Sequence, residues 1–289
     1  MTDNAKAMLL ASFAADAHAL GVHWIYNTNV IDKKYGRVET LIAPTLAAFH
    51  RGKPAGAFTH FGDQMLLLLK SVADYGFNPQ LFSTDWRAFF NHYAGYFDSA
   101  TKTTIANLDK GVTFDQAGSD SDDLGGAARI APLVYAYRHQ SDHLVDAVRT
   151  QTALTHHNET VINIAELMAR TALQVLAGAP PVKALQQETQ ERFADTPLSN
   201  WVEEGIASAA IETRQAISDL GQACEVEVAF PATVHLLARY PSDLKTALIE
   251  NVMAGGDSAA RGMLVGLLLG AHSGSYAIQP WIEGMQARQ

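Results

Sequence analysis

The sequence has few charged side chains and no cluster of basic ones. Lys and Arg number 21 against 30 Asp and Glu, giving a formal net charge of −9, and charged residues make up only 18% of the 289 residues. An acidic chain without a basic patch repels phosphate backbones, which argues against nucleic acid as the main partner. The hydrophobic share of 48% supports a large core and excludes a disordered chain.

Cysteine and long apolar runs are also scarce. Cys224 is the only cysteine, so it has no partner within the chain for a disulfide, for redox chemistry or for a zinc site. The apolar run 263–271 is about half of the roughly 20 residues that a membrane span requires. We therefore expect a cytoplasmic protein that does not enter a membrane. The N-terminal segment, which Asp3 and Asp16 interrupt, is expected to be a helix and not a signal peptide.

Apolar residues recur at a spacing of three to four along most of the chain, which predicts an all-α fold. No linker is long or polar enough to divide the chain, so we predict one compact multi-helix domain over 1–289. Gly262, Gly266 and Gly270 share one helical face and predict a tightly packed central helix. The expected helices span 2–20, 85–97, 125–139, 142–154, 159–176, 182–194, 201–220, 232–239, 243–253 and 258–271, with one strand-like piece at 225–228.

Two polar segments, 58–65 and 255–262, each place an Asp at a helix start. Taken singly, Asp63 and Asp257 are expected to be N-caps, because Asp is common there. If the two helix starts are adjacent, these carboxylates and the hydroxyl of Ser258 would offer hard oxygen ligands for Mg²⁺, beside N–H groups that suit phosphate.

Two further polar segments lie in the middle of the chain. The loop 119–124 holds three acids, a pattern typical of a solvated turn or of a catalytic loop. His156 follows a predicted helix and Asn158 precedes the next, so each has a capping role or a ligand-binding role. A zinc site is a further alternative, and its conceivable ligands are His60, Asp63, His156 and His157, although none of the strong zinc spacings occurs.

Several stretches resemble the ADP-ribosylglycohydrolase family, which includes dinitrogenase-reductase-activating glycohydrolases and J1 crystallins. Residues 15–21 resemble the family's Gly-Asp-Ala-Leu-Gly, and 129–133 resemble its Met-Arg-Ile-Ala-Pro-Leu. Residues 152–156 resemble Ser-Ala-Leu-Thr-His, and 221–232 resemble a Gly-x-x-Cys stretch followed by Pro-Ala. Because these matches occur in register over nearly the whole chain, the resemblance implies an all-α fold of the ADP-ribosylglycohydrolase type.

The resemblance implies hydrolysis of the bond between the anomeric carbon of ADP-ribose and a protein side chain or another acceptor. In the family two Mg²⁺ ions assist, held by a Thr-Asp-Asp-Thr motif and a Gly-Gly-Asp-Thr-Asp-Thr motif. Here 60–63 read His-Phe-Gly-Asp, and 259–260 are alanines after the retained Asp257 and Ser258. We therefore expect one Mg²⁺ ion or none, with Asp63, Asp257 and Ser258 as the ligands.

The same resemblance gives roles to the polar loops. We predict Asp123 or Asp122 as the general base, with Asp120 as a further candidate, and N–H groups after Gly255 and Gly256 as phosphate ligands. Arg261, four residues after Asp257, either replaces a second cation or pairs with Asp257. The predicted substrate-binding residues are Asp16, His60, Gly125, Gly126, His156, Asn158, Gly255, Gly256 and Arg261.

The first hypothesis is therefore a divergent hydrolase acting on an N- or O-linked ADP-ribosyl or related ribosyl compound, either a small molecule or a modified protein. The alternative is a catalytically inactive ADP-ribose-binding or crystallin-like structural protein with the same fold, which the loss of metal acids favours. Retention of the acidic loops favours the hydrolase.

Overall fold

The structure, a computed structural model, describes residues 3–46 and 48–286, and α-helices form its framework. Across these ranges it contains no β-strand beyond two isolated bridges, which confirms the predicted all-α fold. The helices are α1 (Asn4–Ala19), α2 (Thr28–Tyr35), α3 (His60–Tyr75), α4 (Pro79–Asn91), α5 (Ser99–Asp109), α6 (Gly125–Ala128), α7 (Ala131–Tyr137), α8 (Ser141–Ala153), α9 (Glu159–Leu176), α10 (Pro181–Arg192), α11 (Pro197–Ala207), α12 (Thr213–Leu220), α13 (Val226–Arg239), α14 (Leu244–Met253), α15 (Ser258–Ser273) and α16 (Gln279–Gly284), with short 3₁₀ turns η1 (Ala48–His50), η2 (Ser208–Ala210) and η3 (Tyr276–Ile278).

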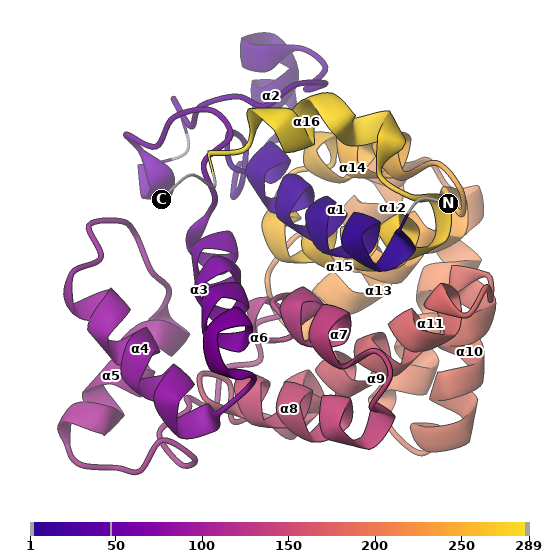
Figure 1. Cartoon of the computed structure of the whole chain (residues 1–289). Helices are drawn as coiled ribbons and strands as arrows, with labels where there is room; N and C mark the ends of the chain where they lie inside the picture. The colour runs from indigo at the N-terminus through magenta and orange to yellow at the C-terminus, as the bar shows by residue number, and fades with distance from the viewer. Residues whose placement is uncertain (1–2, 47, 287–289) are drawn as a thin grey trace.

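Helix α15 is buried along nearly its whole length, and α1 packs along it (Figure 1). A Cβ atom at Gly266 would lie 2.5 Å from the carbonyl oxygen of Ala11, and one at Gly270 would lie 2.7 Å from Ala11 Cβ. Only glycine lets two helix backbones approach this closely. The predicted tightly packed central helix is therefore confirmed.

The other helices surround this pair. Helices α9, α13 and α14 pack against further sides of α15, while α3, α4 and α5 form one edge of the molecule (Figure 1). The buried apolar side chains form one continuous cluster that extends from α1 to α16. None of the helices in the two described ranges has the length and apolar character of a membrane-spanning segment.

Several predicted boundaries were wrong where proline or a short turn interrupts the pattern. The predicted helix 125–139 is divided into α6 and α7, with Pro132 in the first turn of α7. The predicted helix 201–220 is divided into α11, η2 and α12. Helix α4 begins at Pro79, behind the Asn78 cap, and ends at Asn91 instead of spanning 85–97. Helix α1 begins behind the Asp3 cap, and Thr2 lies outside the described residues.

The prediction of a strand-like piece at 225–228 was also wrong. Its alternating pattern is too short to outweigh the helical context, and it forms the first turn of α13. The Val226 N–H donates to the carbonyl oxygen of Asp122 (2.9 Å), and Asp123 and Glu225 form an isolated antiparallel bridge. The segment before α13 is thereby attached to the acidic loop before α6.

Candidate functional site

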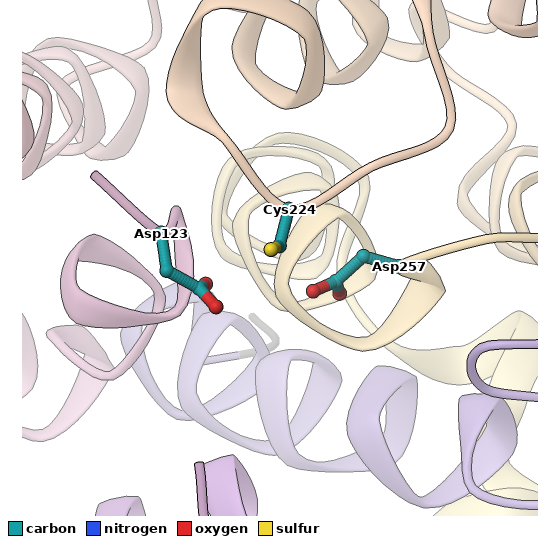
Figure 2. A group of neighbouring side chains, drawn as sticks. All are labelled: Asp123, Cys224 and Asp257. Carbon is teal, nitrogen blue, oxygen red and sulfur yellow. The ribbon is translucent and has the colours of Figure 1, made fainter. Parts of the chain in front are cut away.

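Three segments that are distant in the sequence meet at the N-terminus of α15. Asp257 caps this helix, Asp123 lies in the loop before α6, and Cys224 lies in the turn before α13 (Figure 2). One ligand atom of each side chain lies within 4.8 Å of the other two. Within residues 3–46 and 48–286, no other three or more His, Cys, Asp or Glu side chains converge in this way. We refer to these residues as the Asp123–Cys224–Asp257 group.

Asp257 is fully buried and is held by two hydrogen bonds. The Ala260 N–H donates to its Oδ1 and the indole N–H of Trp24 donates to its Oδ2, each at 3.3 Å. In the described part of the chain no Lys or Arg forms an ion pair with it, and its one such contact is His23 Nδ1 at 3.8 Å. Burial raises the pKa of the Asp257 carboxyl, although the charge of Arg261 and the hydrogen bonds act in the opposite direction.

Asp123, not Asp122, belongs to this group. The Gly125 N–H donates to Asp123 Oδ1 (2.7 Å), and the residue is 8% exposed. Burial and the charges of Asp257 and Asp98 raise the pKa of the Asp123 carboxyl well above its usual value. Asp122 is exposed, and the group does not include it.

Cys224 has neighbours that the sequence does not reveal. Its carbonyl oxygen accepts the Leu124 N–H (2.9 Å), which fixes the turn beside Asp123, and its thiol lies between the two carboxylates (Figure 2). Burial and the charges of Asp123 and Asp257 raise the pKa of the thiol far above its usual value. The expectation that Cys224 lacks any partner for a metal site is therefore wrong.

Comparison with known proteins places the chain in a family. The family model described as ADP-ribosylglycohydrolase matches residues 1–289. The chain belongs to the ADP-ribosylglycohydrolase family. Crystallin J1A of Tripedalia cystophora is 24% identical over 299 residues, covering 97% of this chain and 91% of its own length. An uncharacterized protein of Archaeoglobus fulgidus is 25% identical, with 100% and 93% covered.

A solved structure shares the fold of this ADP-ribosylglycohydrolase family member. It is described as an ADP-ribosylglycohydrolase-related protein complex, and it superposes with a TM-score of 0.73 at 22% identity. The match covers 98% of this chain and 92% of that one. The suspected family and the predicted fold are both confirmed.

The glycine turn before Asp257 does not form the expected phosphate site. Gly255 and Gly256 adopt φ values of 73° and 69°, which favour glycine. The Gly256 N–H donates to the Ile25 carbonyl (3.1 Å) and the Asp257 N–H to the Gln222 carbonyl (2.9 Å). The next three N–H groups bind the Gly256 carbonyl, the His23 ring and the Asp257 carboxylate. Because each donor is used within the protein, none is free for a phosphate oxygen.

Arg261 stabilises this turn. It is fully buried, and its guanidinium donates to Asn251 Oδ1 (3.2 Å) and to the Gly255 carbonyl oxygen (2.6 Å). Burial lowers its pKa to about 10, while the charges of Asp257 and Tyr26 act in the opposite direction. The direct ion pair between Arg261 and Asp257 that the sequence suggested is therefore not formed, and the guanidinium holds the backbone instead.

The segment 60–63, which the resemblance aligned with the Thr-Asp-Asp-Thr motif, is closely packed at the N-terminus of α3. A Cβ atom at Gly62 would lie 2.1 Å from Asp16 Oδ2, so the Asp16 carboxylate occupies the space that a side chain here would need. That carboxylate accepts the Thr59 N–H (2.8 Å) and the Thr59 hydroxyl (2.5 Å). Phe61 is fully buried, and a Cβ atom at Gly125 would lie 2.2 Å from its ring. Asp16 is therefore structural, and Gly125 provides both packing space and an N–H donor.

Asp63 lies outside the Asp123–Cys224–Asp257 group. Its Oδ2 accepts hydrogen bonds from the Lys53 ammonium and from the Tyr93 hydroxyl (2.6 Å). The predicted shared metal site of Asp63 and Asp257 is thus not assembled, because Asp63 already has a cation as its partner.

Histidines occupy the space between the two helix N-termini. His60 is fully buried, and its Nε2 lies 3.2 Å from Asp98 Oδ2. Burial raises the pKa of Asp98, but the hydrogen bond and the electrostatic attraction of the His60 ring act in the opposite direction, and the pKa lies below its usual value. The rings of Trp24 and Tyr96 lie 5.6 Å and 5.5 Å from the His60 ring. No sequence motif contains Asp98, Trp24 or Tyr96, so sequence reasoning does not identify them.

In the segment 154–159, Asn158 caps a helix and His156 packs inside the protein. Asn158 caps α9, accepting the Thr160 and Val161 N–H groups at 3.0 Å and 3.3 Å. His156 is buried against Gly126, and burial lowers its pKa to about 3, so the ring is neutral at pH 7. His157 is exposed. The four residues of the zinc alternative are not brought together among the described side chains.

Proposed function

We propose that this chain is a hydrolase that cleaves an N- or O-glycosidic bond at the anomeric carbon of an ADP-ribosyl or related ribosyl compound, free or attached to a protein. Membership of the ADP-ribosylglycohydrolase family supports the reaction class. One observation supports the site: two carboxylates from distant segments meet at the N-terminus of α15, with no Lys or Arg paired to either in the described part of the chain.

The reaction requires groups that these two residues provide. The oxygen of a water molecule forms a bond to the anomeric carbon as the bond to the leaving group breaks, and positive charge develops on the ribose ring. We assign Asp123 to take the proton from that water and to return it to the leaving group. A raised pKa makes its ionised form a stronger base than an ordinary aspartate. Asp257 then contributes the negative charge that faces the developing oxocarbenium ion.

The residues present do not fit the two Mg²⁺ ions of the family. Mg²⁺ requires six hard oxygen ligands in a nearly octahedral arrangement. Phe61, Gly62 and the alanines at 259–260 offer no side-chain oxygen, and the Asp16 carboxylate fills the space beside Gly62. No step of the proposed reaction therefore depends on that pair of ions. The earlier expectation of one Mg²⁺ ion or none remains a prediction.

The experiment compares two adjacent acids. Purified wild type, Asp123→Asn and the matched control Asp122→Asn are incubated with ADP-ribosylated peptides carrying N- and O-linked acceptors, and released ADP-ribose is quantified. Asp123→Asn is expected to lower kcat/KM by about 100-fold or more, within the range of general-base catalysis. Asp122→Asn is expected to change it less than threefold, since Asp122 is exposed and outside the group. Equal losses in both variants would contradict the assignment.

A second function is supported by a specific relationship. Crystallin J1A is 24% identical over 91% of its own length, and residues 60–62 and 259–260 lack the acids that the resemblance to the family leads one to expect. A binding or structural protein without catalysis would be stabilised by ADP-ribose in thermal denaturation and would release no product from any acceptor. Turnover that Asp123→Asn abolishes would rule this function out.

A further inference from the structure

The Asp123–Cys224–Asp257 group combines donor types that distinguish among metal ions. We propose that it binds one divalent cation that accepts sulfur, of the Zn²⁺ class, in place of the two Mg²⁺ ions of the family. The proposal rests on the proposed function and extends it to a cofactor of the same site. Each carboxylate would offer one oxygen to the ion, which leaves the second oxygen of Asp123 to accept the proton of the attacking water. Metal binding is measurable without any substrate.

The geometry suits one small cation. Carboxylate oxygens of Asp123 and Asp257 and the sulfur of Cys224 lie within 4.8 Å of one another and point toward a common centre (Figure 2). Zinc bonds of about 2.3 Å to sulfur and about 2.1 Å to oxygen place tetrahedral donors about 3.6 Å apart. Side-chain shifts of about 1 Å therefore close the group around such an ion.

The charge of the site supports a cation. Two carboxylates, one fully buried and one 8% exposed, face each other, and no Lys or Arg in residues 3–46 and 48–286 pairs with either. The buried Arg261 guanidinium binds Asn251 and the Gly255 carbonyl instead. The charge of Arg261 acts on Asp257 only from beyond ion-pair distance. Buried charges are normally paired or coordinate a metal, so a bound cation would supply a direct partner.

A buried hydroxyl in the residue that follows Asp257 is a second observation. Ser258 follows Asp257 in the first turn of α15; it is fully buried, and its Oγ makes no hydrogen bond. Most buried polar side-chain atoms have a hydrogen-bond partner, so an unpartnered one at this position points to a missing ligand. A cation held by Asp257 would provide that ligand directly or through a bound water.

The sulfur atom selects the ion. Mg²⁺ prefers oxygen ligands and keeps several waters, whereas thiolate ligands favour Zn²⁺ and related ions. Three protein ligands with a fourth position open is also the arrangement of catalytic zinc sites. Binding must displace the thiol proton of Cys224, so the affinity is expected to rise with pH.

The test titrates metal-free protein, dialysed against a chelator, with Zn²⁺, Cd²⁺ and Mg²⁺. Calorimetry is expected to give one Zn²⁺ or Cd²⁺ per chain, bound at least 100-fold more tightly than Mg²⁺, and Cd²⁺ to produce a sulfur-to-metal charge-transfer band in the ultraviolet. Cys224→Ser should abolish the band and lower the preference for Zn²⁺ over Mg²⁺ by at least tenfold. Circular dichroism checks that each variant is folded.

Asp257→Asn and Asp63→Asn form the matched pair of carboxylate variants. The first should weaken Cd²⁺ binding by at least tenfold, and the second should leave it unchanged, because Asp63 is bonded to Lys53 and Tyr93. Absence of the band in folded wild type, or Cd²⁺ binding that survives Cys224→Ser unaltered, would overturn the proposal. Hydrolysis that persists in chelator would refute a catalytic role for the metal and would leave the proposed hydrolase function standing. Metal binding without hydrolysis would refute the proposed function and would leave the metal site standing.

Discussion

The N-termini of α3 and α15 start from similar sequence features and reach opposite results. Each has a hydroxyl residue, an Asp and a glycine at the helix start. At α15 the Asp257 carboxylate faces a second acid and a thiol and has no Lys or Arg as an ion-pair partner in the described part of the chain. At α3 the Asp63 carboxylate is neutralised by Lys53 and hydrogen-bonded by Tyr93.

The chemical role of a carboxylate therefore depends more on the side chains around it than on the sequence motif that contains it. Lys53 comes from the loop before α3 and Tyr93 from the segment after α4, whereas Asp123 and Cys224 come from loops before α6 and α13. The same residue type is an ion-pair partner at one helix, and at the other it is a buried carboxyl without a Lys or Arg at ion-pair distance among the described residues.

The largest expected effect separates the two acids. Asp257→Asn keeps an N-cap acceptor but removes the charge, so hydrolysis is expected to fall by about 100-fold or more, or about 2.7 kcal/mol. Asp63→Asn should alter kcat/KM by less than threefold. Steady-state kinetics on the same ADP-ribosyl substrate measures kcat/KM for both variants. Similar losses of kcat/KM in the two variants would show that the two helix ends act as one site.

Gly62→Ala tests the close packing between α3 and the Asp16 carboxylate. The new Cβ atom would lie 2.1 Å from Asp16 Oδ2 and 2.8 Å from Phe58 Cβ, so we expect a loss of about 3 kcal/mol in the free energy of unfolding. Urea denaturation followed by circular dichroism measures it. Combining Gly62→Ala with Asp16→Gly should recover part of the loss, and simple additivity of the two changes would argue against their contact.

Asp16 makes stability depend on pH. Burial is the largest influence on its carboxyl and raises the pKa to about 6, although two hydrogen bonds from Thr59 lower it. A carboxyl with a raised pKa binds its proton more tightly in the folded state, so its contribution to the free energy of unfolding falls as pH rises from about 4 to about 6. The decrease is at most about 3 kcal/mol at 1.36 kcal/mol per pKa unit.

The matched variant isolates this effect from other titrating groups. Buried neutral histidines such as His18, whose pKa burial lowers to about 4, act in the opposite direction and lose stability as pH falls below 6.5. The comparison is therefore the difference between wild type and Asp16→Asn, measured by urea denaturation from pH 4 to pH 7. Parallel curves for the two proteins would refute the raised pKa.

The substitution with the least effect on stability changes a hydrogen-bond partner of Asp63. Tyr93→Phe removes the hydroxyl that donates to Asp63 Oδ2 and leaves the Lys53 ion pair, so we expect a loss of about 1 kcal/mol in stability. ADP-ribose binding, measured by calorimetry, should be unchanged. A large loss of binding would mean that the α3 N-terminus contributes to the ligand site after all.

Much of the fold was predictable because helical periodicity is local. Long amphipathic stretches such as α9 were recognised at their true bounds, and the glycine-lined face of α15 was recognised from the four-residue spacing of its glycines. Errors arose where tertiary contacts override the local pattern. The piece 225–228 is a helical turn, and the pattern does not predict the short helices α2 and α5 because each buries only one apolar side chain.

The candidate site was less predictable for a different reason. The polar loops point to Asp123 and Asp257, but a single cysteine gives no indication of a metal site at Cys224, and no motif contains Trp24. Asp63 was assigned to the metal because its position near a helix start resembles that of Asp257. The polar side-chain partners of Cys224, Trp24 and Asp63 lie at least ten positions away in the chain, so local sequence patterns do not predict them.

The helical class, the family, the close packing of α15 and the N-caps at Asp3 and Asn158 follow from the amino-acid sequence alone, because periodicity, glycine spacing and capping act over a few residues. Tertiary packing alone sets whether the Asp carboxylate at the start of α3 or of α15 has a Lys or Arg as an ion-pair partner. Asp257 and Asp123 are 134 positions apart in the numbering, and only the packing of α15 against its neighbours brings them and Cys224 within 4.8 Å. The free energy of a buried charge depends on those distant partners, so the chemistry of the site follows from the fold.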